Sequence, residues 1–118
     1  MKKTKKRILI LEDDIHFQRI LKKLLSKKYE IIFTESLAEA YKTIKKESKF
    51  HVIICDWWVK DGSGVELLNY CKKISYPAKL ILISATHIQQ IKEIKKPSWD
   101  FFIEKPVNIT ELIKIIEK

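Results

Sequence analysis

The 118-residue sequence predicts an α/β fold, in which a parallel sheet has helices on both faces. Short apolar runs of strand length alternate along the chain with stretches in which apolar residues recur every three or four positions. This alternation, without internal repeats or low-complexity segments, is typical of successive βαβ units. Because crossovers between parallel strands are right-handed, the compact arrangement is a doubly wound five-stranded sheet in the order 2-1-3-4-5.

Five apolar segments are predicted to be the strands. They are residues 7–12, 30–34, 51–56, 79–84 and 99–103. In the predicted order the first and third strands are neighbours. Their carboxyl ends therefore border the switch point, which is where open α/β sheets bind ligands.

Five helices are predicted around these strands. Apolar side chains at helical spacing define one face of the first helix (Phe17, Ile20, Leu21, Leu24, Leu25), of the second (Leu37, Ala40, Tyr41, Ile44) and of the last (Ile109, Leu112, Ile113, Ile116). The third helix is predicted over residues 63–74 and the fourth between His87 and Pro97. The fourth has only a thin stripe of Ile88, Ile91 and Ile94, which predicts a marginal element that can shift or repack.

Capping patterns mark three helix starts independently of this periodicity. The pairs are Ser36 with Glu39, Ser63 with Glu66, and Asn108 with Glu111. Asp14 precedes the first helix and is expected to cap it.

Composition limits the function classes. With 46% apolar residues, residues 1–118 are expected to form a single domain without an output domain, residues 1–6 being a basic N-terminal extension. No apolar stretch approaches the ~20 residues of a membrane span, so we expect a cytoplasmic protein. The lysines behind the net charge of +9 are spread over nearly every segment, which favours a solvated surface over nucleic-acid binding. Cys55 and Cys71 lack metal or disulfide spacing and are expected to be core thiols.

Carboxylates follow two of the predicted strands. Glu12 ends the first strand, with Asp13 and Asp14 directly after it, and Asp56 ends the third. Because like charges at close range resist joint ionisation, a cation is expected where these acids converge. Hard carboxylate oxygens suit Mg²⁺, and the paired Glu12 and Asp13 fit the role of metal ligands. Asp56, the lone acid at its strand end, is then the candidate nucleophile for a phosphoryl group.

Two further strand ends carry residues that such a reaction needs. Ser84 ends the fourth strand, and its hydroxyl can donate a hydrogen bond to a phosphoryl oxygen. Lys105 follows the fifth strand, and its ammonium can hold another oxygen. Their arrival at the same sheet edge as the acids points to one reaction site.

The chain has two glycines, and they show where its backbone is least restricted. Gly62 and Gly64 both lie in the connection after Asp56, where Asp61-Gly62 predicts a tight turn with positive φ. Two glycines spaced in this way form neither a P-loop nor a dinucleotide-binding motif, which excludes nucleotide binding by those routes.

Taken together, these features resemble the receiver domain of the two-component response-regulator family over essentially the whole chain. The stretches that carry the resemblance are RILILEDD (7–14), DWWVKDGSG (56–64), ILISA (81–85) and FIEKP (102–106). The resemblance implies a flavodoxin-like fold, which agrees with the predicted sheet order. It also implies that Asp56 accepts a phosphoryl group from a histidine kinase or a histidine phosphotransfer protein.

The resemblance further implies roles for the other site residues. Mg²⁺ is the implied cofactor, and its implied ligands, direct or through water, are Glu12, Asp13, Asp56 and the backbone carbonyl of Trp58. Ser84 and Lys105 are implied to bind the phosphoryl group, and Phe102 is the aromatic side chain whose orientation follows Ser84.

A phosphorylation switch is the function that this resemblance implies, with no catalysis beyond the protein's own phosphotransfer and autodephosphorylation. Charge added at Asp56 draws Ser84 inward, and Phe102 follows. The face formed by the fourth helix, fifth strand and fifth helix then changes partners. Those partners are an unidentified downstream protein or, in a homodimer, a second copy of the chain.

Three residues depart from the family pattern. Lys60 stands where many members have Pro, which predicts a less rigid loop after Asp56, and Phe102 lacks the hydroxyl of the common Tyr. Trp58 lies two residues beyond Asp56, next to the approach of a hydrolytic water, which predicts slow autodephosphorylation.

Two other functions are compatible with some of these sequence features. A phosphate-independent adaptor would use the fold as a scaffold, although the intact acids and Lys105 argue against it. An aspartate-nucleophile phosphatase resembling the haloacid dehalogenase type also uses Asp, Ser or Thr, and Lys, but requires a second Asp where Trp58 stands. The histidines, His16, His51 and His87, have no metal-ligand or triad partner in view and are expected to be structural or surface residues.

Overall fold

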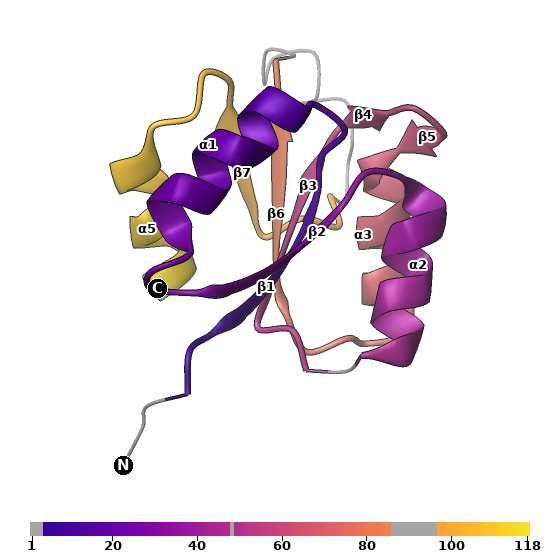
Figure 1. The fold of residues 1–118 in the computed structure, drawn as a ribbon. Helices are drawn as coiled ribbons and strands as arrows, with labels where there is room; N and C mark the ends of the chain where they lie inside the picture. The colour runs from indigo at the N-terminus through magenta and orange to yellow at the C-terminus, as the bar shows by residue number, and fades with distance from the viewer. Residues whose placement is uncertain (1–3, 48, 86–96) are drawn as a thin grey trace.

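A computed structural model describes residues 4–47, 49–85 and 97–118 and contains the predicted parallel sheet (Figure 1). Its strand order is β2-β1-β3-β6-β7, which confirms the order 2-1-3-4-5. The strands are β1 (Arg7–Leu11), β2 (Glu30–Thr34), β3 (Val52–Asp56), β6 (Lys79–Ser84) and β7 (Phe101–Glu104). Leu11 of β1 pairs with Cys55 of β3, so these two strands end level with each other at the switch point.

Helices cover both faces of the sheet. In Figure 1, α1 (Ile15–Leu25) and α5 (Ile109–Glu117) lie on one side, and α2 (Leu37–Lys46) and α3 (Gly64–Lys73) lie on the other. The described part of the chain thus contains four helices. The predicted fourth helix falls on residues that the structure does not describe, and its prediction stays untested.

The core consists of two apolar layers that share the sheet. Ile8 and Ile10 of β1 pack with α1 and α5, whereas Leu9 and Leu11 pack with α2 and α3. All four side chains are at most 1% exposed, as expected for an inner parallel strand that is buried on both faces. Cys55 and Cys71 are also fully buried in this core, which confirms them as core thiols.

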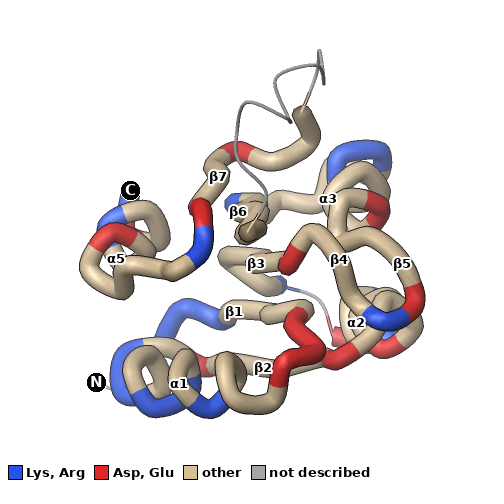
Figure 2. Tube along the Cα trace, turned by 90° about the horizontal axis from the view of Figure 1, so that it is seen from above, with Lys and Arg blue, Asp and Glu red and all other residues tan. Residues whose placement is uncertain are grey.

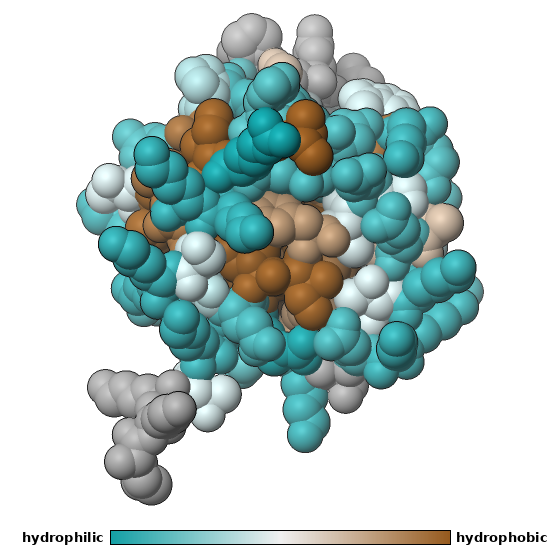
Figure 3. Space-filling model, in the orientation of Figure 1, coloured by the Kyte–Doolittle hydropathy of each residue, from teal (hydrophilic) through white to brown (hydrophobic). Residues whose placement is uncertain are grey.

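One predicted apolar face is narrower than its periodicity indicated. Leu21 and Leu25 of α1 are buried, but Ile20 and Leu24 are 52% and 48% exposed, so the predicted apolar face is only partly buried. A helix that lies on a sheet buries only the residues nearest the sheet, and these two lie at the side of the stripe. In Figure 3, apolar side chains accordingly reach the surface over α1.

Side chains cap the helices close to the predicted positions. Asp14 caps α1 by accepting hydrogen bonds from the amides of His16 and Phe17 at 2.9 and 3.3 Å. Ser36 and Asn108 each accept from the amide three residues on, as predicted. The third cap differs, because Ser63 accepts from the amide of Val65 rather than from that of Glu66.

A short antiparallel hairpin follows β3 and was not predicted. It is formed by β4 (Trp58–Val59) and β5 (Gly62–Ser63), with Val59 paired to Gly62. Gly62 has φ +148°, which confirms the predicted positive φ in this turn. At the end of the hairpin a Cβ on Gly64 would lie 2.0 Å from the carbonyl oxygen of Asp56. This close approach requires glycine at position 64 and packs the start of α3 against the end of β3.

No helix within the described ranges is long and apolar enough to cross a membrane.

Candidate functional site

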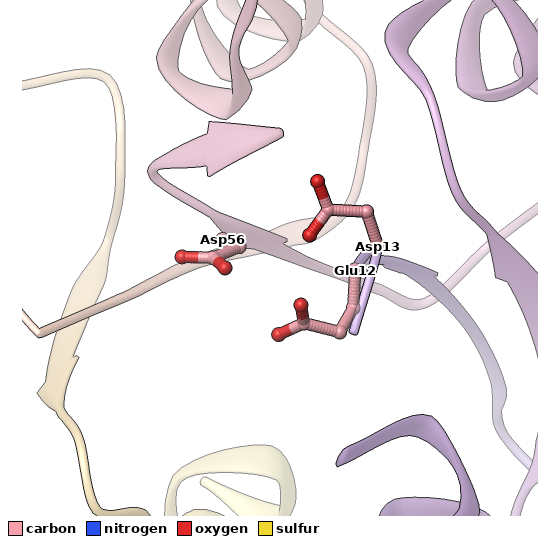
Figure 4. Close-up of side chains that lie close together, drawn as sticks. All are labelled: Glu12, Asp13 and Asp56. Atoms are coloured by element: carbon pink, nitrogen blue, oxygen red, sulfur yellow. The ribbon is translucent and has the colours of Figure 1, made fainter. Parts of the chain in front are cut away.

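Three carboxylates meet at the carboxyl ends of β1 and β3. Carboxylate oxygens of Glu12, Asp13 and Asp56 all lie within 4.8 Å of one another (Figure 4). Glu12 is buried, Asp56 is partly buried and Asp13 is exposed, so the cluster has a closed side and an open side. Seen from above in Figure 2, the acidic ends of β1 and β3 face a basic position that follows β7.

Glu12 is held rigidly on the closed side. Its backbone amide donates to the carbonyl of Thr34 at 2.9 Å, and its Oε2 accepts from the amide of Asp14 at 3.0 Å. Its side chain is only 3% exposed. Burial raises the pKa of Glu12, and the nearby charge of Asp56 adds to this, while the Asp14 amide and Lys105 act in the opposite direction.

Lys105 places a positive charge against two of these acids. Its Nζ lies 3.1 Å from Oδ2 of Asp56 and 3.2 Å from Oε1 of Glu12. Burial opposes its charge, but the hydrogen bonds and charges of Asp56 and Glu12 outweigh this and raise the pKa of Lys105. The ammonium also lies 5.0 Å from the centre of the Phe17 ring, a cation–π contact.

Asp56 is the accessible carboxylate of this ion-paired set. It is the last residue of β3, and its side chain is 15% exposed. The next amide, that of Trp57, donates to the carbonyl of Ile83, so backbone bonding to β6 continues past Asp56. Asp14 serves elsewhere, as the cap of α1. Asp14 thus caps α1 as predicted, while Glu12, Asp13 and Asp56 lie close together.

Ser84 lies at the same edge, at the end of β6. It is 2% exposed, and its carbonyl accepts a hydrogen bond from the backbone amide of Lys105 at 2.9 Å. This bond joins the two predicted phosphoryl-binding residues through their backbones. Phe102 lies earlier on β7, paired with Leu82, and its half-buried ring packs against the core beneath α2 and α3.

Trp58 lies two residues beyond Asp56. It lies in β4, and the residue is 64% exposed. Its ring stacks on that of Trp57, with centroids 6.3 Å apart and planes inclined by 27°, and Trp57 in turn contacts Trp99. The ring of Trp57 thus contacts those of both Trp58 and Trp99.

The contact between Asp61 and α2 was not foreseen from the sequence. Asp61 was predicted only as part of the turn, but its Oδ1 accepts from the amide of Leu37 at 2.7 Å and its Oδ2 from that of Ala38 at 3.1 Å. These bonds lower the pKa of Asp61. An acid next to glycine after a strand signalled a turn, but nothing in the sequence indicated its partner on another element.

Neither histidine within the described ranges belongs to the carboxylate cluster. His51 accepts a hydrogen bond from the backbone amide of Arg7 through Nδ1 at 2.9 Å, which is a structural role. His16 is exposed on α1, and His87 falls among the residues that the structure does not describe.

Comparison with known proteins identifies the family. Residues 8–117 match the model of the response regulator receiver domain. The response regulator receiver protein CpdR of Brucella abortus is 28% identical over 96% of this chain and 95% of its own length. The chain spans only 23% of a second relative, the DNA-binding transcriptional regulator NtrC of Azospirillum brasilense, at 25% identity.

Solved structures agree with this assignment. A CheY-like receiver domain protein from Methanospirillum hungatei superposes with a TM-score of 0.85 at 28% identity, over 97% of this chain and 92% of that one. The response regulator TrrA from Thermotoga maritima, solved in complex with Mg²⁺–BeF, has a TM-score of 0.82 at 27% identity, over 95% and 96% of the two chains. With its flavodoxin-like sheet and its acidic site, this chain belongs to the response regulator receiver domain family.

Proposed function

We propose that the protein is a phosphoacceptor switch of a two-component system, in which Asp56 receives a phosphoryl group from a histidine kinase or a histidine phosphotransfer protein. The observation that supports this most strongly is the environment of Asp56. Its partly exposed carboxylate ends β3 beside two further carboxylates and 3.1 Å from the ammonium of Lys105. A nucleophile, a candidate metal site and a cation thus occupy one open sheet edge.

The donor set fits Mg²⁺. Three hard carboxylates lie close together with one side open, and Mg²⁺ binds such oxygens while keeping waters and phosphate oxygens as its remaining ligands. Glu12, Asp13, Asp56 and the backbone carbonyl of Trp58 are the proposed ligands. When bound, Mg²⁺ would neutralise these carboxylates and supply positive charge for the incoming phosphoryl group. The relative from Thermotoga maritima was solved with Mg²⁺–BeF, which supports the same assignment here.

The chain's own residues perform the transfer in this proposal. An Oδ atom of Asp56 attacks phosphorus, the P–N bond of the phosphohistidine breaks, and its electron pair stays on the imidazole nitrogen. Lys105 is already placed against Asp56, so its ammonium can follow the charge onto the new phosphoryl group. Ser84 is proposed to donate its hydroxyl to another phosphoryl oxygen.

The output is a change of surface. Lys105 and Ser84 are joined by a backbone hydrogen bond at the ends of β7 and β6, and Phe102 lies on β7. A movement of Ser84 toward the phosphoryl group is therefore proposed to reach Phe102 and the face that β7 and α5 share. A downstream protein, or a second copy of the chain, is the proposed reader of that face.

Chemical phosphorylation tests the proposal. The protein is incubated with Mg²⁺ and a small acyl-phosphate donor, and its intact mass is compared with that of Asp56→Asn and Asp14→Asn. We expect one acid-stable, base-labile phosphoryl group on the wild type and on Asp14→Asn, whose altered acid only caps α1. Asp56→Asn should remain unmodified.

The alternatives give different results in the same preparation. If Mg²⁺ changes the tryptophan fluorescence but no adduct forms, the protein is a phosphate-independent adaptor. If it hydrolyses phosphomonoesters with multiple turnovers, it is an aspartate-nucleophile phosphatase. Either result overturns the phosphoacceptor proposal.

A further inference from the structure

The hairpin after Asp56 is fastened at its tip to a different part of the fold. Asp61 lies in the turn between β4 and β5, and its two carboxylate oxygens accept hydrogen bonds from the amides of Leu37 and Ala38 at 2.7 and 3.1 Å. These amides belong to the first turn of α2 and have no partner within that helix. A carboxylate at a helix N-terminus also interacts favourably with the helix dipole.

The other end of the hairpin is fastened next to the nucleophile. The amide of Trp57 donates to the carbonyl of Ile83 at 3.0 Å, and the amide of Gly64 donates to the carbonyl of Trp57 at 2.7 Å. Trp58 therefore lies between two anchors, one beside Asp56 and the other at Asp61. Of the two, the anchor at Asp61 depends on a single side chain.

The hydrogen bonds of Asp61 also connect the hairpin to the backbone that holds Glu12. The segment before α2 leaves β2 at Thr34, whose carbonyl accepts from the amide of Glu12 at 2.9 Å and whose Oγ1 donates to the carbonyl of Ile10 at 3.0 Å. Asp61 thus links the hairpin, through the start of α2 and the end of β2, to the strand end that carries Glu12.

We propose that Asp61 is a positioning residue of the metal site. By holding the β4–β5 hairpin to α2, it fixes the distance between the backbone carbonyl of Trp58 and the carboxylates of Glu12 and Asp13. Loss of the Asp61 carboxylate frees the hairpin tip, so the carbonyl no longer arrives preorganised. Asp61 itself does not contact the ion. The inference rests on the proposed metal-binding function of the site.

Glycine at position 62 supports this role for the turn. A Cβ there would lie 2.7 Å from Cδ1 of Leu37 and 2.9 Å from Oε2 of Glu66. The hairpin tip is therefore packed against the start of α2 as well as hydrogen-bonded to it. An exposed ion pair between Lys60 and Glu35, 3.7 Å apart, spans the same junction but is too solvated to hold it alone.

Magnesium affinity of the full chain, measured by titration calorimetry without any phosphodonor, tests the inference. Supporting residues of metal sites contribute on the order of 10-fold or more to affinity, so Asp61→Ala should raise the Kd for Mg²⁺ by about 10-fold. Asp61→Asn keeps one acceptor oxygen and should give a Kd between those of Asp61→Ala and the wild type. Circular dichroism and denaturant unfolding establish that both variants are folded.

Ser36→Ala is the matched control. Ser36 caps the same helix by accepting from the amide of Glu39 at 3.2 Å, but it does not bond to the hairpin. Its loss should weaken the start of α2 while leaving the Kd for Mg²⁺ at the wild-type value. If Asp61→Ala binds Mg²⁺ as tightly as the wild type, or if Ser36→Ala weakens binding equally, the inference is wrong. If the wild type itself does not bind Mg²⁺, the proposed metal site fails instead.

Discussion

Nζ of Lys105 lies 3.1 Å from Oδ2 of Asp56, and the same ammonium lies 3.2 Å from Oε1 of Glu12. One cation therefore pairs with carboxylates at the ends of two different strands. Because Lys105 is 27% exposed, its ion pairs are weaker than fully buried ones but stronger than surface pairs.

Removal of this cation should make the thermal stability of the protein more sensitive to Mg²⁺. Lys105→Ala leaves the acids uncompensated, so we expect it to lower the free energy of unfolding by about 1 to 2 kcal/mol without metal. Added Mg²⁺ should then raise the melting temperature more in Lys105→Ala than in the wild type. Thermal unfolding with and without Mg²⁺ measures both effects.

Lys72→Ala is the control for that experiment. Lys72 forms an exposed ion pair with Asp100 at 3.4 Å, far along the chain from the acids, and the variant should respond to Mg²⁺ as the wild type does. An equal Mg²⁺-induced shift in Lys105→Ala and the wild type would mean that Lys105 does not neutralise the metal site.

Replacement of Trp58 should shorten the lifetime of the acyl phosphate. Trp58 is 64% exposed and lies two residues beyond Asp56, where we propose that its indole hinders the approach of a hydrolytic water. In Trp58→Ala and Trp58→Asn we expect several-fold faster loss of the phosphoryl group, followed by mass spectrometry after the donor is removed. The loss in stability should stay below about 1 kcal/mol, because mainly the stacking on Trp57 is lost. Ile74→Ala, another exposed apolar residue, is the control, and a decay rate that Trp58 substitutions leave unchanged refutes the prediction.

The two glycines should tolerate a methyl group differently. A Cβ at Gly64 meets the backbone oxygen of Asp56 at 2.0 Å, so Gly64→Ala has to move β3 or α3 and should cost about 3 kcal/mol. At Gly62 the nearest atom, at 2.7 Å, is the end of the Leu37 side chain, which can rotate away. The strain of its positive φ then leaves a cost of about 1 to 2 kcal/mol. Denaturant unfolding of both variants measures the two losses of stability. A larger loss in Gly62→Ala than in Gly64→Ala would contradict the prediction.

Both cysteines should resist modification in the folded protein. Burial raises the pKa of Cys71 to about 11 and that of Cys55 well above its ordinary value, so neither forms appreciable thiolate at pH 8. In the unfolded chain these thiols ionise near their ordinary pKa of 9.0, so the stability they contribute is full below that pH and falls as pH rises toward 11. Modification by a chromogenic disulfide reagent at pH 8 should proceed only as fast as the protein opens. Rapid reaction without denaturant would contradict the buried positions.

The sheet order could be predicted because buried strands and right-handed crossovers leave few arrangements. The same reasoning brought Glu12 and Asp56 to one edge, and with them Lys105. Periodicity placed Ile20 and Leu24 on the apolar face of α1 but could not tell how wide a part of that face the sheet would cover, and both residues are exposed. It gives the direction of a face but not the extent of its contact.

The hairpin and its anchor lay beyond sequence reasoning for another reason. Strands of two residues, such as β4 and β5, are too short to show any period. The bond between Asp61 and Leu37 joins residues 24 positions apart, and such a contact depends on how α2 is placed rather than on local pattern. The two ion pairs of Lys105 likewise depend on side-chain distances that only the folded chain defines.

The most direct test of the account is the identity of the residue that carries the phosphoryl group. After phosphorylation by a small acyl-phosphate donor in Mg²⁺, borohydride reduction converts an aspartyl phosphate to homoserine, which peptide mass spectrometry can locate. The account predicts homoserine at position 56 alone, with the neighbouring carboxylates of Glu12 and Asp13 unmodified. Homoserine at position 13, or no reduced residue in a protein that binds Mg²⁺, would contradict it.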